Sequence, residues 1–347
     1  MKVVYSREHE KHAARAELKD GAFIPARETP SRAHTIKACL EARHFGDFCA
    51  PHAEPRAAIA AIHAPDYLEF LENLWPRWCA FKQSSDPGDA FPFVFPARTE
   101  TRPHRPASLG GQLGYYSFDI GSPFTAGAFD AAFSGAACAL SAQQHVTAGA
   151  PAAFSLSRPP GHHAYADAYG GYCFLNNAAI AAQGFLADGA SRVAILDVDY
   201  HHGNGTQAIF YDRADVLFIS IHADPAFEYP YFAGAKDEIG SGAGEGANVN
   251  LPLPQGTGWD AYGEALEEAC RILTAFGPDG FVLSLGADIY RGDPLSTFDL
   301  DSGDFTRLGR RLGRLRLPTA ILLEGGYAVE ELGTNIHNAL AGFLDEC

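Results

Sequence analysis

The segment ILDVDYHHGNG, residues 195–205, joins an apolar run to two aspartates and two adjacent histidines. Alternate residues of an extended chain point the same way, so Asp199 and His201 can face one ion while Val198 and Tyr200 face away. A carboxylate and an imidazole are two of the three protein ligands that a catalytic Zn²⁺ usually takes. The segment therefore predicts part of a metal centre at the end of a buried strand.

A further acid follows another apolar run, FVLSLGAD at 281–288, which ends in Asp288. The carboxyl ends of parallel strands line one crevice, which is where ligands bind in open α/β folds. Asp199, His201 and Asp288 together therefore predict a centre for one divalent ion. Each aspartate alone is also typical of a helix N-cap, and the combination with His201 favours the metal site.

Two more apolar runs end in groups that a hydrolase needs. The first, at 152–164, breaks at a Pro-Pro-Gly turn before His162 and His163. The second, at 319–327, ends in two glycines and Tyr327. An imidazole can act as a base near neutral pH, and a phenol can donate to an oxyanion. Structural histidines and a packed tyrosine are the alternatives for either feature taken alone.

These motifs follow one another in a fixed order along nearly the whole chain. They are RPPGHHA (158–164), GGYCFLNNAA (170–179), DVDYHHGNGTQ (197–207), SLGAD (284–288), DPL (293–295) and EGGY (324–327). Together they resemble the zinc-dependent histone deacetylase superfamily. Within it, the segments 15–34 and 113–129 look most like bacterial acetylpolyamine amidohydrolases.

The resemblance implies that Asp199, His201 and Asp288 bind one catalytic Zn²⁺, with Fe²⁺ as an alternative metal in cells. It also implies catalytic roles for five further side chains: His163 as general base and then acid, His162 as its electrostatic partner, Tyr327 as oxyanion donor, Asp197 as the partner of His162 and Asn204 as the partner of His163. Many family members have Asp in place of Asn204. A neutral amide supports an imidazolium less than a carboxylate does, so we expect a lower pKa for His163.

The resemblance also implies contacts with the substrate and with a second cation. The carbonyl of Gly171 would accept the substrate amide N–H, and Tyr172 and Tyr229 would form the aromatic walls of a narrow channel. Ordinary core packing is the alternative for either tyrosine. A structural K⁺ would be held by carbonyls and side chains of Asp197, Asp199, His201, Ser220 and Ile221.

Specificity beyond the channel depends on charged groups near its mouth. A polyamine needs a carboxylate near its distal ammonium, and the resemblance favours Glu17 for this role. Some relatives carry acids near the segment that corresponds to GQLG, whereas the nearest acid here is Asp119. Lys19 stands where some relatives have an aromatic residue. Both departures weaken the expected selectivity for long polyamines and leave room for short acetyl-diamines or other amides.

From about residue 130 the sequence alternates between helix and strand patterns. We expect helices at 176–188, 205–212, 258–276, 302–315 and 329–344, and strands at 215–222, 281–286 and 319–323. This order predicts an α/β fold: a single-domain, open, doubly wound, mostly parallel sheet flanked by helices, with the active site at the carboxyl ends of the strands. We expect residues 1–347 to form one catalytic domain.

The segment 81–129 lacks any sustained period and is rich in proline, glycine and aromatic residues. A long irregular stretch inside a compact domain is usually functional. Its aromatic residues are too apolar to leave in water: Phe91, Phe93, Phe95, Tyr115, Tyr116 and Phe118. We therefore expect this insertion to form a homodimer contact and to shape the channel, as the resemblance also implies.

The composition limits the partners and the compartment. The 26 Lys and Arg against 42 Asp and Glu give a formal net charge of −16, which repels nucleic acid and favours small cations. Seven cysteines without a C-x-x-C pair are typical of a reduced compartment. No apolar signal-peptide region and no run long enough to span a membrane are apparent. We expect a cytoplasmic enzyme without nucleic-acid or membrane partners.

The sequence thus predicts a zinc-dependent amidohydrolase that removes acetyl groups from N-acetylated polyamines or diamines, such as acetylputrescine and acetylcadaverine. A deacetylase for acetyl-lysine in proteins and an amidohydrolase for another small acylated amine are the alternatives. A binder without catalysis would have lost a ligand, His163 or Tyr327, and all are present. A binuclear manganese ureohydrolase would need further His and Asp ligands around RPPGHH, and the sequence offers none there.

Overall fold

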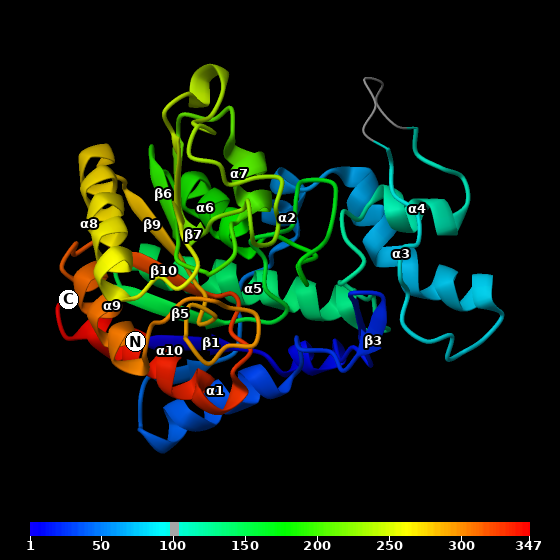
Figure 1. Cartoon of the computed structure of the whole chain (residues 1–347), viewed down its shortest axis with the longest axis horizontal. Coiled ribbons are helices and arrows are strands. Elements are labelled where there is room, and N and C mark those ends of the chain that lie inside the picture. The colour runs from blue at the N-terminus through cyan, green and yellow to red at the C-terminus, as the bar shows by residue number, and fades with distance from the viewer. Residues whose placement is uncertain (98–103) are drawn as a thin grey trace.

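An eight-stranded sheet in the order β4-β1-β5-β10-β9-β6-β7-β8 forms the centre of the computed structural model, which describes residues 1–97 and 104–347 (Figure 1). Each neighbouring pair is parallel. The strands are β1 (Lys2–Tyr5), β4 (Asp47–Cys49), β5 (Ala152–Leu156), β6 (Val193–Asp197), β7 (Val216–Ala223), β8 (Asn248–Leu253), β9 (Gly280–Leu285) and β10 (Thr319–Leu323). The predicted fold class is confirmed.

Helices cover both faces of this sheet (Figure 1). One layer contains α1 (Ser31–Ala42), α8 (Trp259–Phe276), α9 (Ser302–Gly313) and α10 (Val329–Leu344), and the other contains α2 (Arg56–Ile62), α5 (Ala128–Thr147), α6 (Asn177–Ala187) and α7 (Asn204–Phe210). Alternate residues of a strand enter opposite layers: Ile195 joins the core under α5 and α6, whereas Ala194 and Leu196 join the core under α8 and α10. The central strands are therefore apolar on both sides.

The elements predicted after residue 130 are all present, with ends shifted by a residue or two. Helix α6 shows how a motif residue sets such an end, because the Asn176 side chain accepts a hydrogen bond from the Ala179 N–H at 2.9 Å. Strand β8 was not predicted. Its inward positions carry Asn248 and Asn250, which donate to the buried Gln207 side chain, so its pattern lacks the apolar run of the other strands.

The segment 81–129 leads from helix α3 (Pro65–Lys82) through α4 (Leu109–Tyr115) into α5, and its residues 98–103 lie outside the described part. In Figure 1, α3 and α4 lie at the far end from α8. Tyr116 is fully buried within the chain, whereas Phe93 is 80% exposed. Only some of its aromatic residues therefore pack inside the monomer.

A hairpin and two short helices complete the described fold. The hairpin β2 (Glu17–Lys19) and β3 (Ala22–Ile24) is antiparallel, and η1 (Arg7–Lys11) and η2 (Gly242–Gly244) are short 3₁₀ helices. Among the described helices, none has the length and apolar character needed to cross a bilayer.

Candidate active site

The predicted catalytic residues follow four strands that are neighbours in the sheet, β5, β10, β9 and β6. Parallel strands present their carboxyl ends at one edge, so the loops that follow them meet there. These loops carry the functional side chains: His162 and His163 after β5, Tyr327 after β10, Asp288 after β9, and Asp199 and His201 after β6. Strand order therefore explains why residues up to 165 positions apart share one site.

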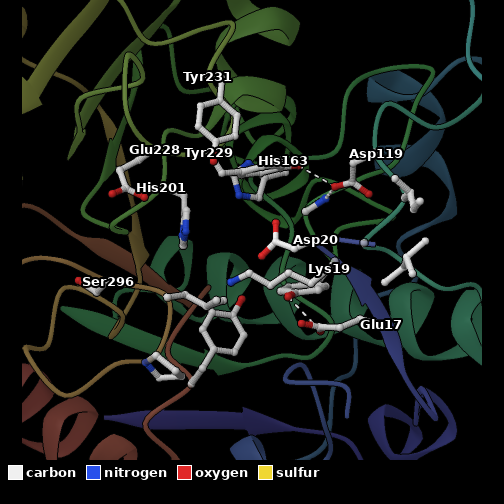
Figure 2. Close-up of a pocket in the computed structure, with 18 of the residues that line it drawn as sticks. Glu17, Lys19, Asp20, Asp119, His163, His201, Glu228, Tyr229, Tyr231 and Ser296 are labelled. Carbon is white, nitrogen blue, oxygen red and sulfur yellow. Dashed lines mark hydrogen bonds between the residues drawn. The ribbon is translucent and has the colours of Figure 1, made fainter. Parts of the chain in front are cut away.

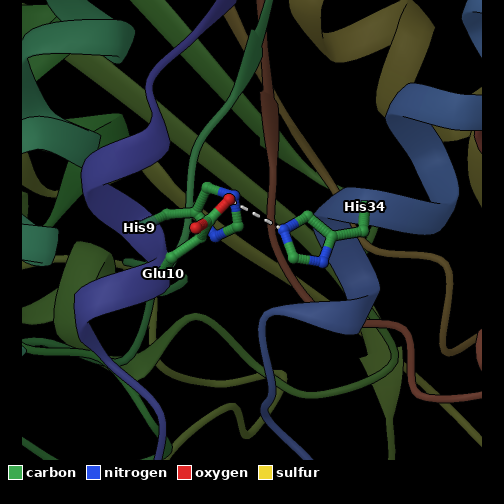
Figure 3. Close-up of side chains that lie close together, drawn as sticks. All are labelled: His9, Glu10 and His34. Atoms are coloured by element: carbon green, nitrogen blue, oxygen red, sulfur yellow. Dashed lines mark hydrogen bonds and ion pairs between the residues drawn. The ribbon is translucent and has the colours of Figure 1, made fainter.

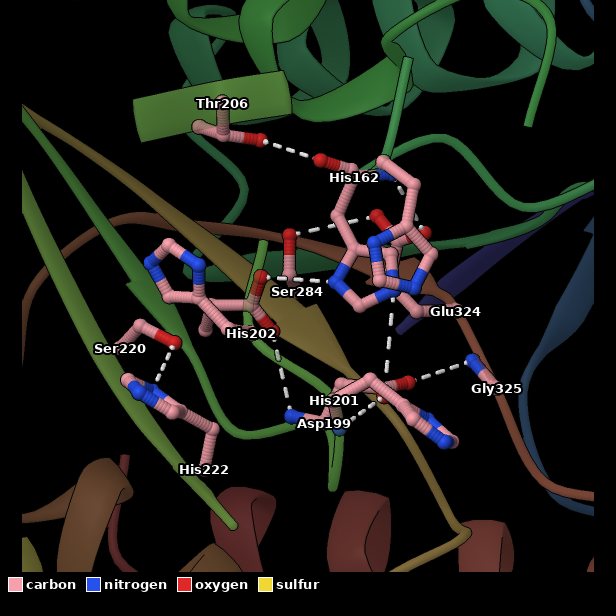
Figure 4. Close-up of polar contacts among 12 residues, drawn as sticks. His162, Asp199, His201, His202, Thr206, Ser220, His222, Ser284, Glu324 and Gly325 are labelled. Atoms are coloured by element: carbon pink, nitrogen blue, oxygen red, sulfur yellow. Dashed lines mark hydrogen bonds and ion pairs between the residues drawn. The ribbon is translucent and has the colours of Figure 1, made fainter. Parts of the chain in front are cut away.

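The three predicted metal ligands face one another. The Nδ1 atom of His201 lies 3.0 Å from Asp288 Oδ2 and 3.3 Å from Asp199 Oδ1. Backbone N–H groups hold the other carboxylate oxygens. Gly325 donates to Asp199 Oδ2 at 2.7 Å (Figure 4), and Tyr200 donates to Asp288 Oδ1 at 3.1 Å. One oxygen of each acid and one imidazole nitrogen are thus directed to a common point.

The local backbone differs in one respect from the extended strand that we expected. Strand β6 ends at Asp197, and the following residues bend. The alternation nevertheless persists, since Val198 and Tyr200 are fully buried in the core while Asp199 and His201 face the site. Neither acid caps a helix, because Gly203 stands at the N-cap of α7 and Asp288 accepts from the Tyr200 N–H instead.

The charges of this group fit a divalent cation. Asp199 and Asp288 are both fully buried. Burial and the neighbouring Asp199 carboxylate raise the pKa of Asp288, and burial alone would lower the pKa of His201, which the two acids instead raise to about 10. The buried acids therefore attract positive charge to this point, and a divalent cation would take the place of these protons. Donor atoms about 2.1 Å from a tetrahedral ion are about 3.4 Å apart, close to the separations seen here. The donor set therefore suits an ion such as Zn²⁺.

Two glycines make room for these acids. A Cβ atom on Gly325 would lie 2.3 Å from Asp288 Oδ2, and one on Gly286 would lie 2.2 Å from Asp199 Oδ2. Both distances are well below van der Waals contact, so any larger residue would displace a carboxylate.

The two histidines after β5 have different partners and different charges. The His162 Nδ1 lies 2.9 Å from Asp197 Oδ2; burial alone would lower the His162 pKa, but Asp197 and Asp199 raise it well above its usual range. The His163 Nδ1 lies 2.6 Å from Asn204 Oδ1, and burial, His162 and His201 lower the His163 pKa well below its usual range. His163 is thus the neutral imidazole of the pair.

The amide of Asn204 also fixes the tautomer of His163. Its Nδ2 donates to the Tyr165 hydroxyl at 3.1 Å, so its Oδ1 is left to accept from His163 Nδ1–H. The Nε2 lone pair of His163 is then free to take a proton.

Tyr327 is held in place through its backbone and its ring. Asp293 accepts from the Tyr327 N–H at 2.5 Å and from the Ala328 N–H at 3.0 Å. The guanidinium carbon of Arg32 lies 4.7 Å from the centre of the Tyr327 ring. The Arg32 side chain also donates to the carbonyls of Gly326 at 2.6 Å and Glu324 at 2.5 Å. This buried cation therefore orders the whole Glu-Gly-Gly-Tyr turn.

These groups open onto a pocket with a cavity volume of about 470 Å³ (Figure 2). His162, His163, His201 and Tyr327 line it together with the predicted channel residues Gly171, Tyr172 and Tyr229. The ring centres of Tyr229 and His163 are 5.0 Å apart, and those of Tyr172 and Tyr327 are 5.7 Å apart. Aromatic walls thus stand beside the candidate base and the candidate oxyanion donor.

Two acids of the pocket brace these walls. Glu17 Oε2 accepts from the Tyr172 hydroxyl at 3.0 Å, and Asp119 Oδ2 accepts from the Tyr229 hydroxyl at 2.8 Å and from the Gly171 N–H at 2.6 Å. Asp119 therefore joins the wall formed by Tyr229 to the turn at Gly171, which carries the other wall, Tyr172.

The residues predicted for a monovalent cation lie on β6 and β7 or directly after β6. Asp197 at the end of β6 is in register with Ser220 of β7, and Ile221 follows it. The Asp197 Oδ1 accepts from the Asp199 N–H at 3.1 Å, while Ser220 Oγ lies 2.8 Å from His222 Nδ1 (Figure 4). Asp197 and Ser220 thus lie side by side, next to the loop that carries Asp199 and His201.

Two other clusters of possible metal ligands have their atoms engaged in other contacts. The first consists of His162, Cys173 and Glu324. Glu324 Oε2 accepts from the N–H groups of Gly161 at 2.7 Å and His162 at 3.2 Å, and Cys173 Sγ donates to the Gly171 carbonyl. These contacts give Glu324 and Cys173 a structural role in holding the two loops.

The second cluster brings the exposed Glu10 and His34 close to the buried His9 (Figure 3). Arg158 can only donate, so His9 Nδ1 accepts from it at 3.3 Å, and His9 Nε2–H then faces the Tyr5 hydroxyl at 3.0 Å. Both ring nitrogens of His9 are occupied, which leaves an ordinary surface contact of 3.1 Å between His34 and Glu10.

Several functional residues were missed by sequence reasoning. Asp119 was noted only as the nearest acid, and Asp293 only as part of a motif. Arg32 and Glu324 lie in the quoted segments 15–34 and EGGY but were given no role. Their chemistry depends on backbone atoms of distant loops, which a sequence does not reveal.

Comparisons with known proteins agree with this geometry. The model of the histone deacetylase domain family matches residues 26–343. Acetylpolyamine amidohydrolase 1 of Pseudomonas aeruginosa is 53% identical over 99% of both chains, and the acetylpolyamine amidohydrolase of Mycoplana ramosa is 44% identical over 99% of both. The crystal structure of acetylpolyamine aminohydrolase from Burkholderia pseudomallei superposes with a TM-score of 0.94 at 42% identity, covering 100% of this chain and 99% of that one. The chain therefore belongs to the histone deacetylase family of deacetylases and amidohydrolases.

Proposed function

We propose that this chain is a metal-dependent amidohydrolase that removes acetyl groups from N-acetylated polyamines or diamines. The observation that carries the proposal is the pocket itself, in which a neutral histidine, a phenol and a buried His–Asp–Asp group lie beneath two tyrosine walls. The full-length relatives named as acetylpolyamine amidohydrolases support this substrate class. Residues 1–347 would act as one catalytic domain.

The catalytic metal would be held by Asp199, His201 and Asp288, with Zn²⁺ as the first candidate and Fe²⁺ as an alternative in cells. When bound, such an ion polarises the amide carbonyl and lowers the pKa of water at its open position. A structural K⁺ is proposed for the carbonyls and side chains near Asp197 and Ser220.

Proton transfer would be performed by His163. Its Nε2 lone pair takes the proton of the attacking water while the Nδ1–H stays bonded to Asn204. The resulting imidazolium then delivers this proton to the departing amine nitrogen. His162, kept cationic by Asp197, lowers the basicity of His163 in the resting site and favours release of that proton.

Tyr327 would donate its hydroxyl hydrogen to the carbonyl oxygen as this becomes an oxyanion. Burial raises the pKa of the Tyr327 phenol, so the group keeps its proton at neutral pH. Its position does not depend on the substrate, because Asp293 and Arg32 hold the turn from behind. Such preorganisation is what makes an oxyanion donor effective.

The walls of the channel would select a straight chain. Tyr172 and Tyr229 would grip the methylene groups next to the acetamide, and the Gly171 carbonyl would accept the amide N–H. Glu17 lines the same pocket, and its carboxylate already bonds to the Tyr172 hydroxyl. Glu17 would therefore act mainly by fixing this wall.

A homodimer formed through the insertion is also proposed. Around the insertion several large apolar side chains are exposed: Phe23, Phe81, Phe93, Val94 and Phe95. A monomer rarely leaves such a group in water. Sedimentation of the full chain should give twice the mass of 37.2 kDa, and replacing Phe93 and Val94 with serine should shift it towards the monomer.

Acetate release by zinc-loaded protein tests the proposed function. N-acetylputrescine, N-acetylcadaverine and an acetyl-lysine peptide are compared by kcat/KM. We expect turnover of the small amides and little of the peptide, because a peptide must present its side chain through a mouth lined on several sides. A clear preference for the peptide would instead support a protein deacetylase, and turnover of none of the three would refute the amidohydrolase proposal.

A further inference from the structure

The two deep acids of the pocket cannot easily receive a distal ammonium. Glu17 accepts from the Arg27 N–H at 3.1 Å and the Tyr172 hydroxyl, and it lies 3.6 Å from the Arg27 guanidinium. Asp119 Oδ2 is engaged by Gly171 and Tyr229, as described above, and Asp119 Oδ1 is buried without a hydrogen-bond partner among the described residues. An ammonium could reach either acid only by displacing contacts that hold the channel walls.

Charged groups without such partners lie at the mouth instead. Lys19 and Asp20 are exposed and line the pocket, and in the described part of the chain neither forms an ion pair. Glu228, at the upper left of Figure 2, also lines the pocket and accepts from Gln255 at 2.7 Å through one oxygen. The mouth of the pocket therefore carries one positively charged side chain, Lys19, and two carboxylates, Asp20 and Glu228.

The β2–β3 hairpin fixes the direction of Lys19. Glu17 and Lys19 are alternate residues of β2, so their side chains leave the same face of the strand, about 7 Å apart. Asp20 and Gly21 both have positive φ, 50° and 79°, which is the conformation of a tight two-residue hairpin turn. Figure 2 shows the Lys19 side chain reaching towards the middle of the lining residues.

A diamine tail carries only positive charge, so Lys19 opposes it while Asp20 and Glu228 attract it. A tail with both an ammonium and a carboxylate would satisfy all three groups. We propose that Lys19 binds a substrate carboxylate, so that the preferred substrates are ω-N-acylated amino acids such as free Nε-acetyl-L-lysine. This inference rests on the proposed amidohydrolase chemistry and departs from the proposed diamine preference, because it places ω-N-acylated amino acids ahead of acetylated diamines.

Three amides with the same five-carbon chain test it. N-pentylacetamide has an uncharged end, N-acetylcadaverine ends in an ammonium, and Nε-acetyl-L-lysine adds a carboxylate beside that ammonium. Acetate release by the zinc-loaded full chain gives kcat/KM for each. We expect the wild type to favour Nε-acetyl-L-lysine over N-acetylcadaverine.

The Lys19→Gln variant should lower this preference by about fivefold or more, which corresponds to the attraction of two unit charges about 4 Å apart in water-like surroundings. The change should lie in KM, because the contact is far from the reacting amide. Lys236→Gln is the matched control: this lysine is also exposed, and it does not line the pocket. It should leave the ratio unchanged.

A wild-type preference for N-acetylcadaverine, or a ratio that Lys19→Gln leaves unaltered, would overturn the role of Lys19. Turnover of N-pentylacetamide separates this failure from a failure of the proposed function. If that neutral amide is hydrolysed, the chemistry stands and only the carboxylate subsite is wrong. If none of the three amides releases acetate, the amidohydrolase proposal itself is refuted.

Discussion

Replacing Tyr327 with phenylalanine removes one oxygen from the candidate site and little else. The ring can keep its contact with Arg32, whose guanidinium carbon lies 4.7 Å from the ring centre, and the backbone keeps its bonds to Asp293. No hydrogen bond from the Tyr327 hydroxyl to another described residue is present. The folded state should therefore lose almost no stability.

Tyr327→Phe should instead weaken the stabilisation of the transition state. Loss of one oxyanion donor typically costs about 2.7–4 kcal/mol, or about 10²–10³ in kcat. Because the hydroxyl bonds the oxygen most strongly when it becomes negative, kcat should fall with little change in KM. The free energy of unfolding, measured by thermal denaturation, should stay within about 0.5 kcal/mol of the wild-type value.

Steady-state hydrolysis of N-acetylcadaverine measures the change, with metal content verified for each protein. Tyr231→Phe is the control, since Tyr231 also lines the pocket but is 54% exposed at its mouth. It should retain nearly full activity. If Tyr327→Phe keeps kcat within about threefold of the wild type, the assignment of the oxyanion donor is wrong.

Three further outcomes follow from buried groups. Arg32→Met should destabilise the fold by about 3–5 kcal/mol in urea, because it removes one of the two arginines that pair with the buried Glu28 and leaves two backbone carbonyls without their donor; a smaller loss would contradict this role. Burial alone would raise the pKa of Glu28, but Arg158 and Arg32 lower it to about 2 from 4.5. The stabilisation from this ionised carboxylate, about 3 kcal/mol, should be complete above pH 4.5 and disappear as the pH falls towards 2, so the stability gap between wild type and Glu28→Gln should close over that range. Gly325→Ala should abolish stoichiometric zinc binding in equilibrium dialysis, because its Cβ would overlap the Asp288 carboxylate; unchanged binding would argue against this packing.

Much of the fold could be predicted because its central strands are short, apolar and regularly alternated with helices. β10 and α10 begin and end where the pattern indicates. The same regularity makes the site predictable, since motifs at the ends of parallel strands must converge. Asp199, His201 and Asp288 thus meet although His201 and Asp288 are 87 residues apart in the sequence.

The parts of the site that could not be predicted depend on contacts that leave no periodic pattern in the sequence. Asp119 belongs to an irregular segment, and its carboxylate bonds to a backbone N–H 52 residues away. The role of Arg32 likewise depends on the carbonyls of a turn 292 and 294 residues further along the chain. Backbone groups are the same at every position, so the sequence carries no mark of which of them a buried side chain will find.

The location of a bound ion tests the central claim most directly. An anomalous difference map at the zinc edge, from crystals of the zinc-loaded chain, should contain one strong peak per chain between Asp199, His201 and Asp288, facing His163 and Tyr327. A strong peak elsewhere with none between these three side chains would contradict the proposed active site.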